Sequence, residues 1–476
     1  MAFDRHIRIV LAGVFAAAAA ARVAYILLNF DIDWEYDPYG HVVVAKSIYN
    51  HLPGSLWAAM GWWAKPLYTL FFGTLYEVLP RRWPALVMTQ LANVAFWLAA
   101  VWLTLVVARE TFEHRLTPVV LAVICGFSFI TFRSSVSANT EPMGAFVLAL
   151  GLYCWHRRHW LAASLCFGLV PLVRTDGAII AAIFGLVAML EAWRTQRWHG
   201  IADAFLRGAL IASPTLLWYL ANFIHAGDVL SGAVSGNLGL AAGVWGFGEP
   251  WDYVVSFGAF DPVPSLCFAF GAAFVLRRPR QAGDVLLIST LMALAYFVAM
   301  TVLWTWGLFG AAGFVRYFVY AYPLYILVAG VAVDRLLLHF VHSPRHSPEK
   351  AAVALSIGVA LSLHWFAHGI VWINHNNSIP PASDLPRLNQ FPVAWDEKPI
   401  YADYPEVIYY LCRGGRQCFY SPLTEIANLS AHGFFIFATN LSEDDTLGIS
   451  LSSANGLALR GTIKGPYKQV IYVFER

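Results

Sequence analysis

The chain has 476 residues, of which 59% are hydrophobic and 13% charged, and its mean hydropathy is +0.58. Soluble domains carry about 25% charged residues, so this composition excludes an ordinary soluble protein and indicates an integral, multi-pass membrane protein. The formal net charge of +2 gives no reason to expect a nucleic-acid partner.

Apolar runs that approach the length needed to cross a bilayer predict about eleven transmembrane helices. The first run is too long for the apolar region of a signal peptide and lacks a small-residue cleavage site, so we expect it to be retained. The predicted spans are 7–28, 85–108, 116–132, 141–155, 160–173, 177–193, 204–224, 254–276, 284–304, 317–338 and 351–373.

Basic residues cluster at every second gap between these spans, which fixes the expected orientation. By the positive-inside rule, the side that carries these clusters is cytoplasmic. The alternation supports the count of spans and places the C-terminal region outside the cytoplasm. We expect the protein in the plasma (inner) membrane. The clusters lie at 108–115, 156–159, 191–200, 277–281 and 342–350.

The long first outer loop is predicted to hold two helices that lie in or near the membrane interface. Residues 37–51 show an amphipathic pattern at helical spacing. Residues 65–79 are apolar but too short to cross, and treating them as a span would move the later basic clusters outside. Further along, the Gly-rich loop 225–253 suits a flexible cover over an acceptor site.

After about residue 373 the composition changes, and residues 374–476 are predicted to form a small extracytoplasmic α/β domain. Short strands are expected in "KPIYAD", "QCFYSP", "GFFIFAT" and "KQVIYVFER", with a helix in "YPEVIYYLCR". In this region Cys412 and Cys418 either pair or stay free, because spacing alone does not fix disulfide geometry.

Four carboxylates follow the first span within seven residues, in "DIDWEYD" (31–37). They either keep the span from sliding inward or form a site. Asp31 and Asp33 present hard oxygen ligands that suit a divalent cation such as Mg²⁺ or Mn²⁺. Asp37 precedes a proline at a helix start, which suits an N-cap, and it can share one helix face with His41.

Other charged residues recur at the predicted outer ends of spans. Each has a structural interpretation: carboxylates suit helix N-termini, and arginines suit snorkelling anchors. The whole set on one membrane face is harder to explain structurally, and it predicts a site there. Its members are Lys65, Glu141, Arg174, Asp176, Arg316 and Tyr317.

These motifs resemble the GT-C superfamily of membrane glycosyltransferases that use polyprenyl-phosphate-linked sugars, including protein O-mannosyltransferases and the lipid A aminoarabinose transferase. The resemblance covers about residues 1 to 373, and "YDPYGH" is similar to the acidic motif of oligosaccharyltransferases, although the WWDYG motif of that family is absent. The motifs that carry it are the acidic stretch, the "KP" helix, "TEP", "RTDG" and "RYFVYAYPLYIL".

The resemblance implies an inverting hexosyl- or pentosyltransferase that moves a sugar from a polyprenyl-phosphate donor to a glycan, lipid or protein acceptor. Asp37 would act as general base. Lys65, Arg174, Arg316 and Tyr317 would bind the donor phosphate, and His41, Glu141 and Asp176 would support the site or the acceptor.

Two other functions fit a polytopic membrane protein with these charges. A lipid-linked sugar transporter or flippase would place ionisable residues near the centres of spans. A polysaccharide polymerase or ligase would concentrate charge in a large, late outer loop, whereas loop 225–253 is nearly uncharged. Both patterns are weaker here than the glycosyltransferase pattern.

Overall fold

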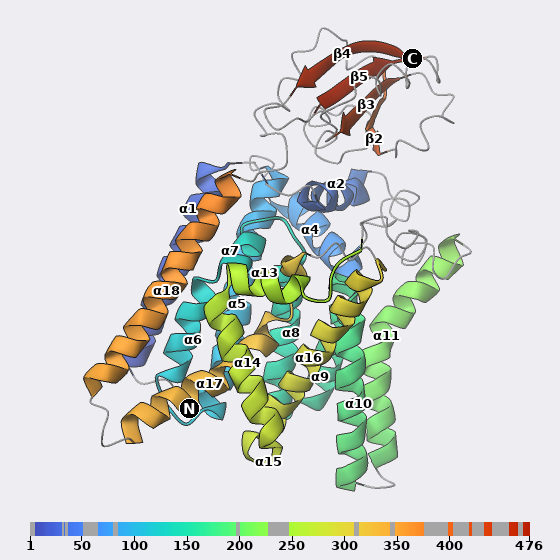
Figure 1. Cartoon of the computed structure of the whole chain (residues 1–476). Coiled ribbons are helices and arrows are strands. Elements are labelled where there is room, and N and C mark those ends of the chain that lie inside the picture. The colour runs from blue at the N-terminus through green and yellow to red at the C-terminus, as the bar shows by residue number, and fades with distance from the viewer. Residues whose placement is uncertain are drawn as a thin grey trace.

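The structure, a computed structural model of the chain, is a bundle of α-helices joined to one small β-sheet (Figure 1). Statements below concern only the residues that it describes. These are 5–30, 33, 37–50, 65–79, 84–196, 200–226, 247–308, 314–342, 348–375, 398–402, 418–420, 433–439, 457–464 and 470–476.

Helices occupy nearly every run that hydropathy predicted, and their ends fall at prolines, glycines and polar residues. They are α1 (Arg5–Leu28), α2 (Asp37–Asn50), α4 (Pro66–Val78), α5 (Ala85–Thr111), α6 (Thr117–Gly126), α7 (Phe129–Ser135), α8 (Glu141–His156), α9 (Trp160–Val173), α10 (Gly177–Gln196), α11 (Gly200–Ala226), α13 (Asp252–Phe260), α14 (Pro262–Arg277), α15 (Pro279–Ala282), α16 (Asp284–Thr305), the 3₁₀ helix η2 (Val315–Phe318), α17 (Tyr322–His342) and α18 (Pro348–His375).

The helical part is that of a multi-pass membrane protein. Within the described residues, five helices are long and apolar enough to cross a bilayer, and α6 with α7 makes a sixth if the bent pair is one span. Apolar side chains such as Leu216 and Phe270 are exposed on the outside of the bundle, as lipid contact requires. The count of eleven spans stays a prediction.

Two predicted spans are interrupted. The run 116–132 divides into α6 and α7, whose axes differ by 58°. The run 254–276 divides at Asp261, because Pro262 disfavours helical backbone at the preceding residue. The two breaks meet: Asp261 accepts hydrogen bonds from the backbone N–H groups of Phe129 (3.1 Å) and Ile130 (3.3 Å), at the start of α7.

A second buried charge, Arg22, binds the backbone on the α6 side of the same break. Arg22 of α1 is fully buried and donates to the carbonyl oxygen of Gly126 (2.8 Å), where α6 ends, and to Ser135 Oγ (2.7 Å) at the end of α7. A cation therefore meets the negative end of α6, while the Asp261 carboxylate meets the positive end of α7. Both charges lie inside predicted spans, where the sequence analysis found no clear ionisable residues.

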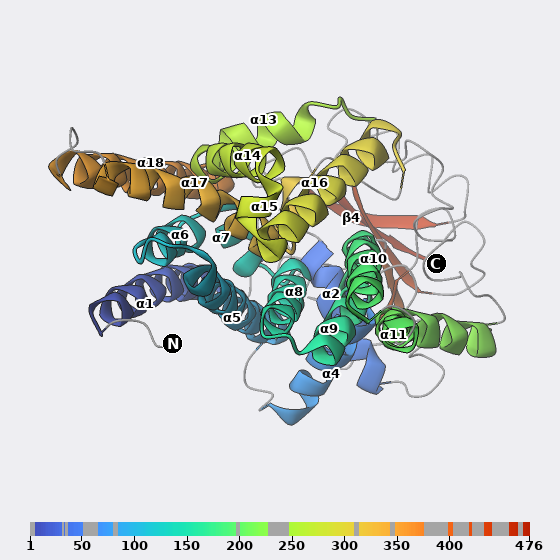
Figure 2. The same ribbon diagram turned by 90° about the horizontal axis from the view of Figure 1, so that it is seen from below.

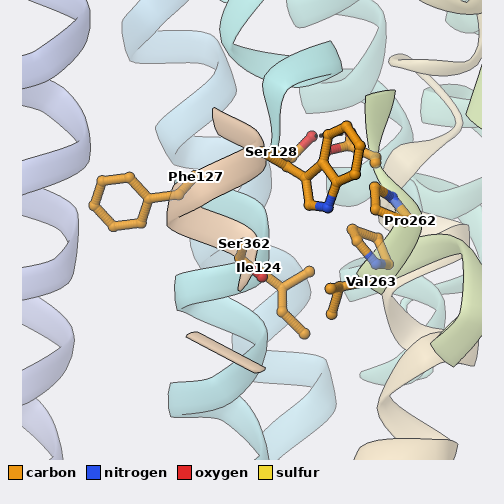
Figure 3. A pocket seen from close by; sticks show the side chains of 9 residues that line it. Ile124, Phe127, Ser128, Pro262, Val263 and Ser362 are labelled. Carbon is orange, nitrogen blue, oxygen red and sulfur yellow. Dashed lines mark hydrogen bonds between the residues drawn. The ribbon is translucent and has the colours of Figure 1, made fainter. Parts of the chain in front are cut away.

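The surroundings of Asp261 are mostly apolar. Side chains of α6, α14 and α18 line a small pocket beside Ser128, among them Ile124, Val263 and Ser362 (Figure 3). Ser128 Oγ donates to Asp261 at 2.5 Å. In such surroundings the carboxylate depends on these donors, because a buried anion without hydrogen bonds is costly.

The C-terminal region forms a five-stranded sheet in the order β2-β1-β3-β5-β4. β1 pairs in parallel with β2 and β3, whereas β5 is antiparallel to β3 and β4. Its small core contains Phe435, Tyr472 and Phe474. The strands are β1 (Ile400–Ala402), β2 (Cys418–Tyr420), β3 (Phe434–Thr439), β4 (Ala458–Lys464) and β5 (Val470–Glu475).

Four of these strands lie where the sequence predicted them, and β4 was missed. β4 is an edge strand with exposed side chains and a bulge between Leu459 and Gly461, so it lacks the apolar alternation of a buried strand. The predicted helix at 404–413 and Cys412 lie outside the described residues, and the Cys418 side chain is not described. The disulfide therefore stays a prediction.

The sheet lies beyond one end of the bundle, next to α2 and near the upper end of α18 (Figure 1). The view along the bundle shows α8 and α9 near its middle, with α1 and α18 toward one side and α11 toward the other (Figure 2). α15 lies at the end opposite the sheet, in one of the predicted basic clusters. The helix ends that carry the predicted site residues face the sheet.

Candidate functional site

The centre of the candidate site is the segment 137–141, which runs from the connection between α7 and α8 to the first residue of α8. Asp33, five residues after the end of α1, is 2% exposed and receives hydrogen bonds from this segment. Ser137 Oγ lies 2.9 Å from both carboxylate oxygens, and the backbone N–H of Ala138 donates at 2.8 Å. The carboxylate thus supplies the acceptors that this buried, non-helical backbone needs.

Two further side chains bind the carbonyl groups of the same segment. Asn93 of α5 donates through Nδ2 to the carbonyl oxygens of Ser137 (2.8 Å) and Asn139 (2.7 Å). Tyr68 of α4 donates to the carbonyl oxygen of Ala138 at 2.6 Å. The segment 137–141 is therefore held by α4, α5 and the residue that follows α1.

Arg174 brings two of the predicted carboxylates together. It follows α9 in the turn "RTDG", where a Cβ on Gly177 would lie 2.6 Å from Val170 Cγ1, so a larger residue would displace that side chain. Its Nη1 lies 2.5 Å from Glu141 Oε1, and its Nε and Nη2 lie 3.0 and 3.2 Å from the two oxygens of Asp176. The Asp176 pair is bidentate, the stronger geometry for an arginine–carboxylate pair.

The surroundings of Arg174 keep it charged. Its guanidinium lies over the rings of Tyr317 (5.1 Å) and Tyr320 (5.5 Å). Burial by itself would lower the pKa of Arg174, but the carboxylates of Asp176 and Glu141 outweigh burial and hold that pKa well above its ordinary value. Arg174 is a cation shared by two carboxylates.

Tyr296 of α16 links this turn to the η2 segment. Its hydroxyl lies 2.6 Å from Asp176 Oδ2 and 3.1 Å from the carbonyl oxygen of Tyr317. The neighbouring Arg316 is 6% exposed, and its Nη1 lies 3.5 Å from Asn139 Oδ1. Two predicted basic residues, Arg174 and Arg316, therefore approach consecutive parts of the segment 137–141.

The α2 and α4 helices bring the remaining predicted residues to the same end of the bundle. His41 of α2 is buried, and its ring lies edge-on to Tyr68 with centroids 5.5 Å apart. Lys65 is half-buried and directly precedes α4, one helical turn from Tyr68. Asp37 is the first residue of α2, but its side chain lies outside the described set.

The predicted metal pair is only half described, because Asp31 lies outside the described residues. Asp33 uses both oxygens to accept from Ser137 and Ala138. In the part of the chain that the structure describes, no group of three or more His, Cys, Asp or Glu side chains is arranged to hold a metal ion. The described residues alone do not make the predicted site for Mg²⁺ or Mn²⁺.

The residues of this arrangement that were not predicted include Asn93, Tyr68, Asn139 and Tyr296. Asn93 and Gln90 are buried amides in a long apolar helix, and they were the available signal, because a buried amide needs partners. The tyrosines give no such signal, since aromatic residues are common throughout the chain. Only the packing of α4 and α16 assigns them to the site.

The arrangement of these helices is similar to that of solved structures of ArnT, and this likeness of fold agrees with the fold that the motifs led us to expect. The crystal structure of ArnT from Cupriavidus metallidurans bound to undecaprenyl phosphate is similar, with a TM-score of 0.62 and 14% identity over 97% of each chain. The apo state of that ArnT gives a TM-score of 0.59 and 13% identity, over 95% of this chain and 97% of that one.

A third similar structure is the Archaeoglobus fulgidus oligosaccharyltransferase in complex with Zn and sulfate, with a TM-score of 0.48 and 13% identity over 93% of this chain and 70% of that one. No protein-family model and no curated protein matches the sequence. The similarity is therefore one of fold, and it was found by comparing structures and not sequences.

Proposed function

We propose that this protein is an inverting glycosyltransferase that transfers a sugar from a polyprenyl-phosphate donor to an acceptor on the extracytoplasmic face of the membrane. The observation that carries the proposal is the arrangement around the segment 137–141. Side chains from α4, α5, α8, η2 and the α9–α10 turn meet there, at one end of an apolar bundle with the GT-C fold.

The reaction needs a base and positive charge at separate points. The acceptor hydroxyl attacks the anomeric carbon, its proton goes to the Asp37 carboxylate, and the bond from that carbon to the phosphate oxygen breaks. The electron pair leaves with the polyprenyl phosphate, whose negative charge requires cations. Lys65 at the start of α4 and Arg316 in η2 supply them in this proposal, with Tyr317 and His41 beside the site.

The contacts of Arg174 support a role other than the phosphate ligand expected from the sequence. Its guanidinium is bound to Asp176 on one edge and to Glu141 on another. A phosphate that displaced these carboxylates would leave the buried Glu141 without its cation, which is destabilising. We propose that Arg174 holds Glu141 and Asp176 in place and that these carboxylates support the acceptor.

The proposed donor class agrees with the ligand of a structural neighbour. The ArnT structure that is similar over 97% of this chain contains undecaprenyl phosphate.

The experiment that tests the proposal incubates the purified protein with radiolabelled polyprenyl-phosphate sugars and a panel of glycan, lipid and protein acceptors. Transfer of label that is lost in Arg316→Met supports the proposal. Label that only crosses the membrane, without transfer, would contradict it and favour a flippase.

The assay also tests the predicted cation. Loss of transfer in EDTA, restored by Mg²⁺ or Mn²⁺, would support a site built with Asp31. Unchanged transfer in EDTA would remove the metal from the proposal.

Arg22 and Asp261 bear on the transporter hypothesis, which predicts ionisable side chains near span centres. Arg22 donates to the carbonyl oxygen of Gly126 at the end of α6, and Asp261 accepts from the N–H groups of Phe129 and Ile130 at the start of α7. They fix a bend in the backbone, and neither favours a transport pathway.

The proposal also includes the domain boundaries and the sidedness. Residues 1–373 would form the catalytic membrane domain. Residues 374–476 would form an extracytoplasmic domain that modulates acceptor binding without catalytic groups. A reporter fused after Arg476 tests the orientation: activity of a cytoplasm-only reporter would overturn it, and activity of a periplasm-only reporter would support it.

A further inference from the structure

Tyr68 is a residue through which the two halves of the candidate site touch directly. One half consists of α2 and α4, which carry Asp37, His41 and Lys65. The other half is built on the segment 137–141, with Arg174 and Arg316 bound to it. Tyr68 belongs to α4, contacts the ring of His41, and donates a hydrogen bond to Ala138 in the other half.

Its contacts have two separable components. The ring is fully buried and packs on Phe72 (4.4 Å between centroids) and on His41. The hydroxyl contributes a hydrogen bond of 2.6 Å to a carbonyl oxygen of the segment 137–141. A substitution to phenylalanine keeps the first component and removes only the second.

We propose that Tyr68 is a positioning residue that couples the Lys65 end of α4 to the segment 137–141. When a phosphate binds at Lys65, the first turn of α4 is ordered, and the Tyr68 hydroxyl passes this restraint to Ala138. The segment then orders Asn139 beside Arg316 and Glu141 beside Arg174. This inference rests on the proposed function, in which Lys65 binds the donor phosphate.

The chain offers a matched control on the same helix. Tyr76 of α4 also has a hydrogen-bonded hydroxyl, which pairs with Thr89 Oγ1. It lies eight residues after Tyr68, about 12 Å further along the helix axis. Tyr76→Phe therefore removes a comparable hydroxyl from α4 without touching the segment 137–141.

The first measurement is hydrogen exchange of the peptide that covers 132–141, in the full-length protein without ligand. We expect faster exchange there in Tyr68→Phe than in wild type, and wild-type exchange in Tyr76→Phe. Equal exchange in the two variants would overturn the inference. This measurement does not depend on catalysis, so it separates a failure of the coupling from a failure of the proposed function.

The second measurement adds undecaprenyl phosphate. In wild type and in Tyr76→Phe we expect undecaprenyl phosphate to slow exchange both at the start of α4 and at 132–141. In Tyr68→Phe it should slow exchange only at the start of α4.

With a labelled donor, kcat should fall about 10- to 100-fold in Tyr68→Phe with KM for the donor unchanged, because small misplacements of reacting groups are costly. A higher KM for the donor together with a lower kcat would overturn the positioning role. If undecaprenyl phosphate slows exchange nowhere in wild type, the proposed function and this coupling to it both fail.

Discussion

Both ends of the helical bundle carry ion pairs, but the pairs differ in burial. At the end with the candidate site, Arg174 is 11% exposed and pairs with Glu141, which is 2% exposed. At the opposite end, Arg157 at the end of α8 is 36% exposed and pairs with Glu110 of α5 at 2.8 Å. The distances are similar, so only the surroundings distinguish the two pairs.

Burial changes what such a pair does. An exposed pair gains little, because water screens it and both long side chains lose freedom. Burying a pair costs the desolvation of both charges. Removing one partner then leaves a single charge in a medium that solvates it poorly. The pairs at the site end therefore fix geometry, whereas those at the other end complement exposed helix ends.

The largest expected effect tests whether the site end is catalytic. Asp37→Asn keeps the size of the side chain and the capacity to cap α2 but removes the proton acceptor. Transfer should fall about 10²- to 10⁴-fold, because that is the range for general-base catalysis, while donor binding persists. Turnover with labelled donor measures the effect.

The control for that prediction is Asp284→Asn, which changes the first residue of α16 among the basic clusters at the other end. It should leave turnover unchanged. Near-wild-type turnover in a folded Asp37→Asn protein would leave only the capping role and move the base to Asp31 or Asp33.

The next largest effect compares the two ion pairs directly. Arg174→Met leaves the buried Glu141 and the partly buried Asp176 without their cation, which should cost about 3 kcal/mol of stability. Arg157→Met removes an exposed partner and should leave thermal unfolding in detergent unchanged. Equal melting temperatures for the two variants would contradict the distinction drawn from burial.

A smaller effect is expected where buried carboxylates bind helix ends. Asp261→Asn replaces an acceptor of two backbone N–H groups with an amide that can accept through one oxygen only, so it should cost about 2 kcal/mol. Asp334 receives the His114 N–H and the Thr117 hydroxyl on a single oxygen, Oδ1. Asp334→Asn can keep that oxygen, and its melting temperature should fall less.

The smallest effect concerns an exposed pair on the sheet. Hydrogen bonds from Lys398 and Arg460 hold the pKa of Glu475 below its ordinary value. A lowered pKa means that the folded state gains stability above the pKa of the unfolded chain and loses it as the pH falls through the folded pKa. Glu475→Gln should therefore melt slightly lower than wild type at pH 7, with the difference vanishing near pH 3. A difference that persists at pH 3 would assign the effect to packing.

Hydropathy, together with prolines and glycines at helix starts, predicted most of the helices from the sequence. Prolines and glycines mark the starts of α4, α8 and α10, and the predicted bounds of these helices differ from the observed ones by three residues or fewer. The reason is local: a run of apolar residues in a bilayer must satisfy its own backbone hydrogen bonds, so it forms a helix. Strand β4 escaped prediction because an exposed edge carries no apolar period.

The motifs also predicted which residue types would meet at one end, but not their partners. Glu141, Arg174 and Asp176 were expected on the same face, and alternating span direction was enough to place them there. Their pairing depends on how α8, α9 and α10 pack, which the spacing of charges along the chain does not encode. For that reason the sequence favoured Arg174 as a phosphate ligand, while its contacts in the fold are with two carboxylates.

What the sequence determined by itself was the class of protein, the helices and the face on which charged residues collect, because each depends on neighbouring residues and on the bilayer. What only the tertiary structure decided were contacts between distant segments: Arg22 with Gly126, Asp261 with Phe129, and Tyr68 with Ala138. Each satisfies a buried polar group whose cost depends on its whole environment, and that environment exists only after the helices have packed.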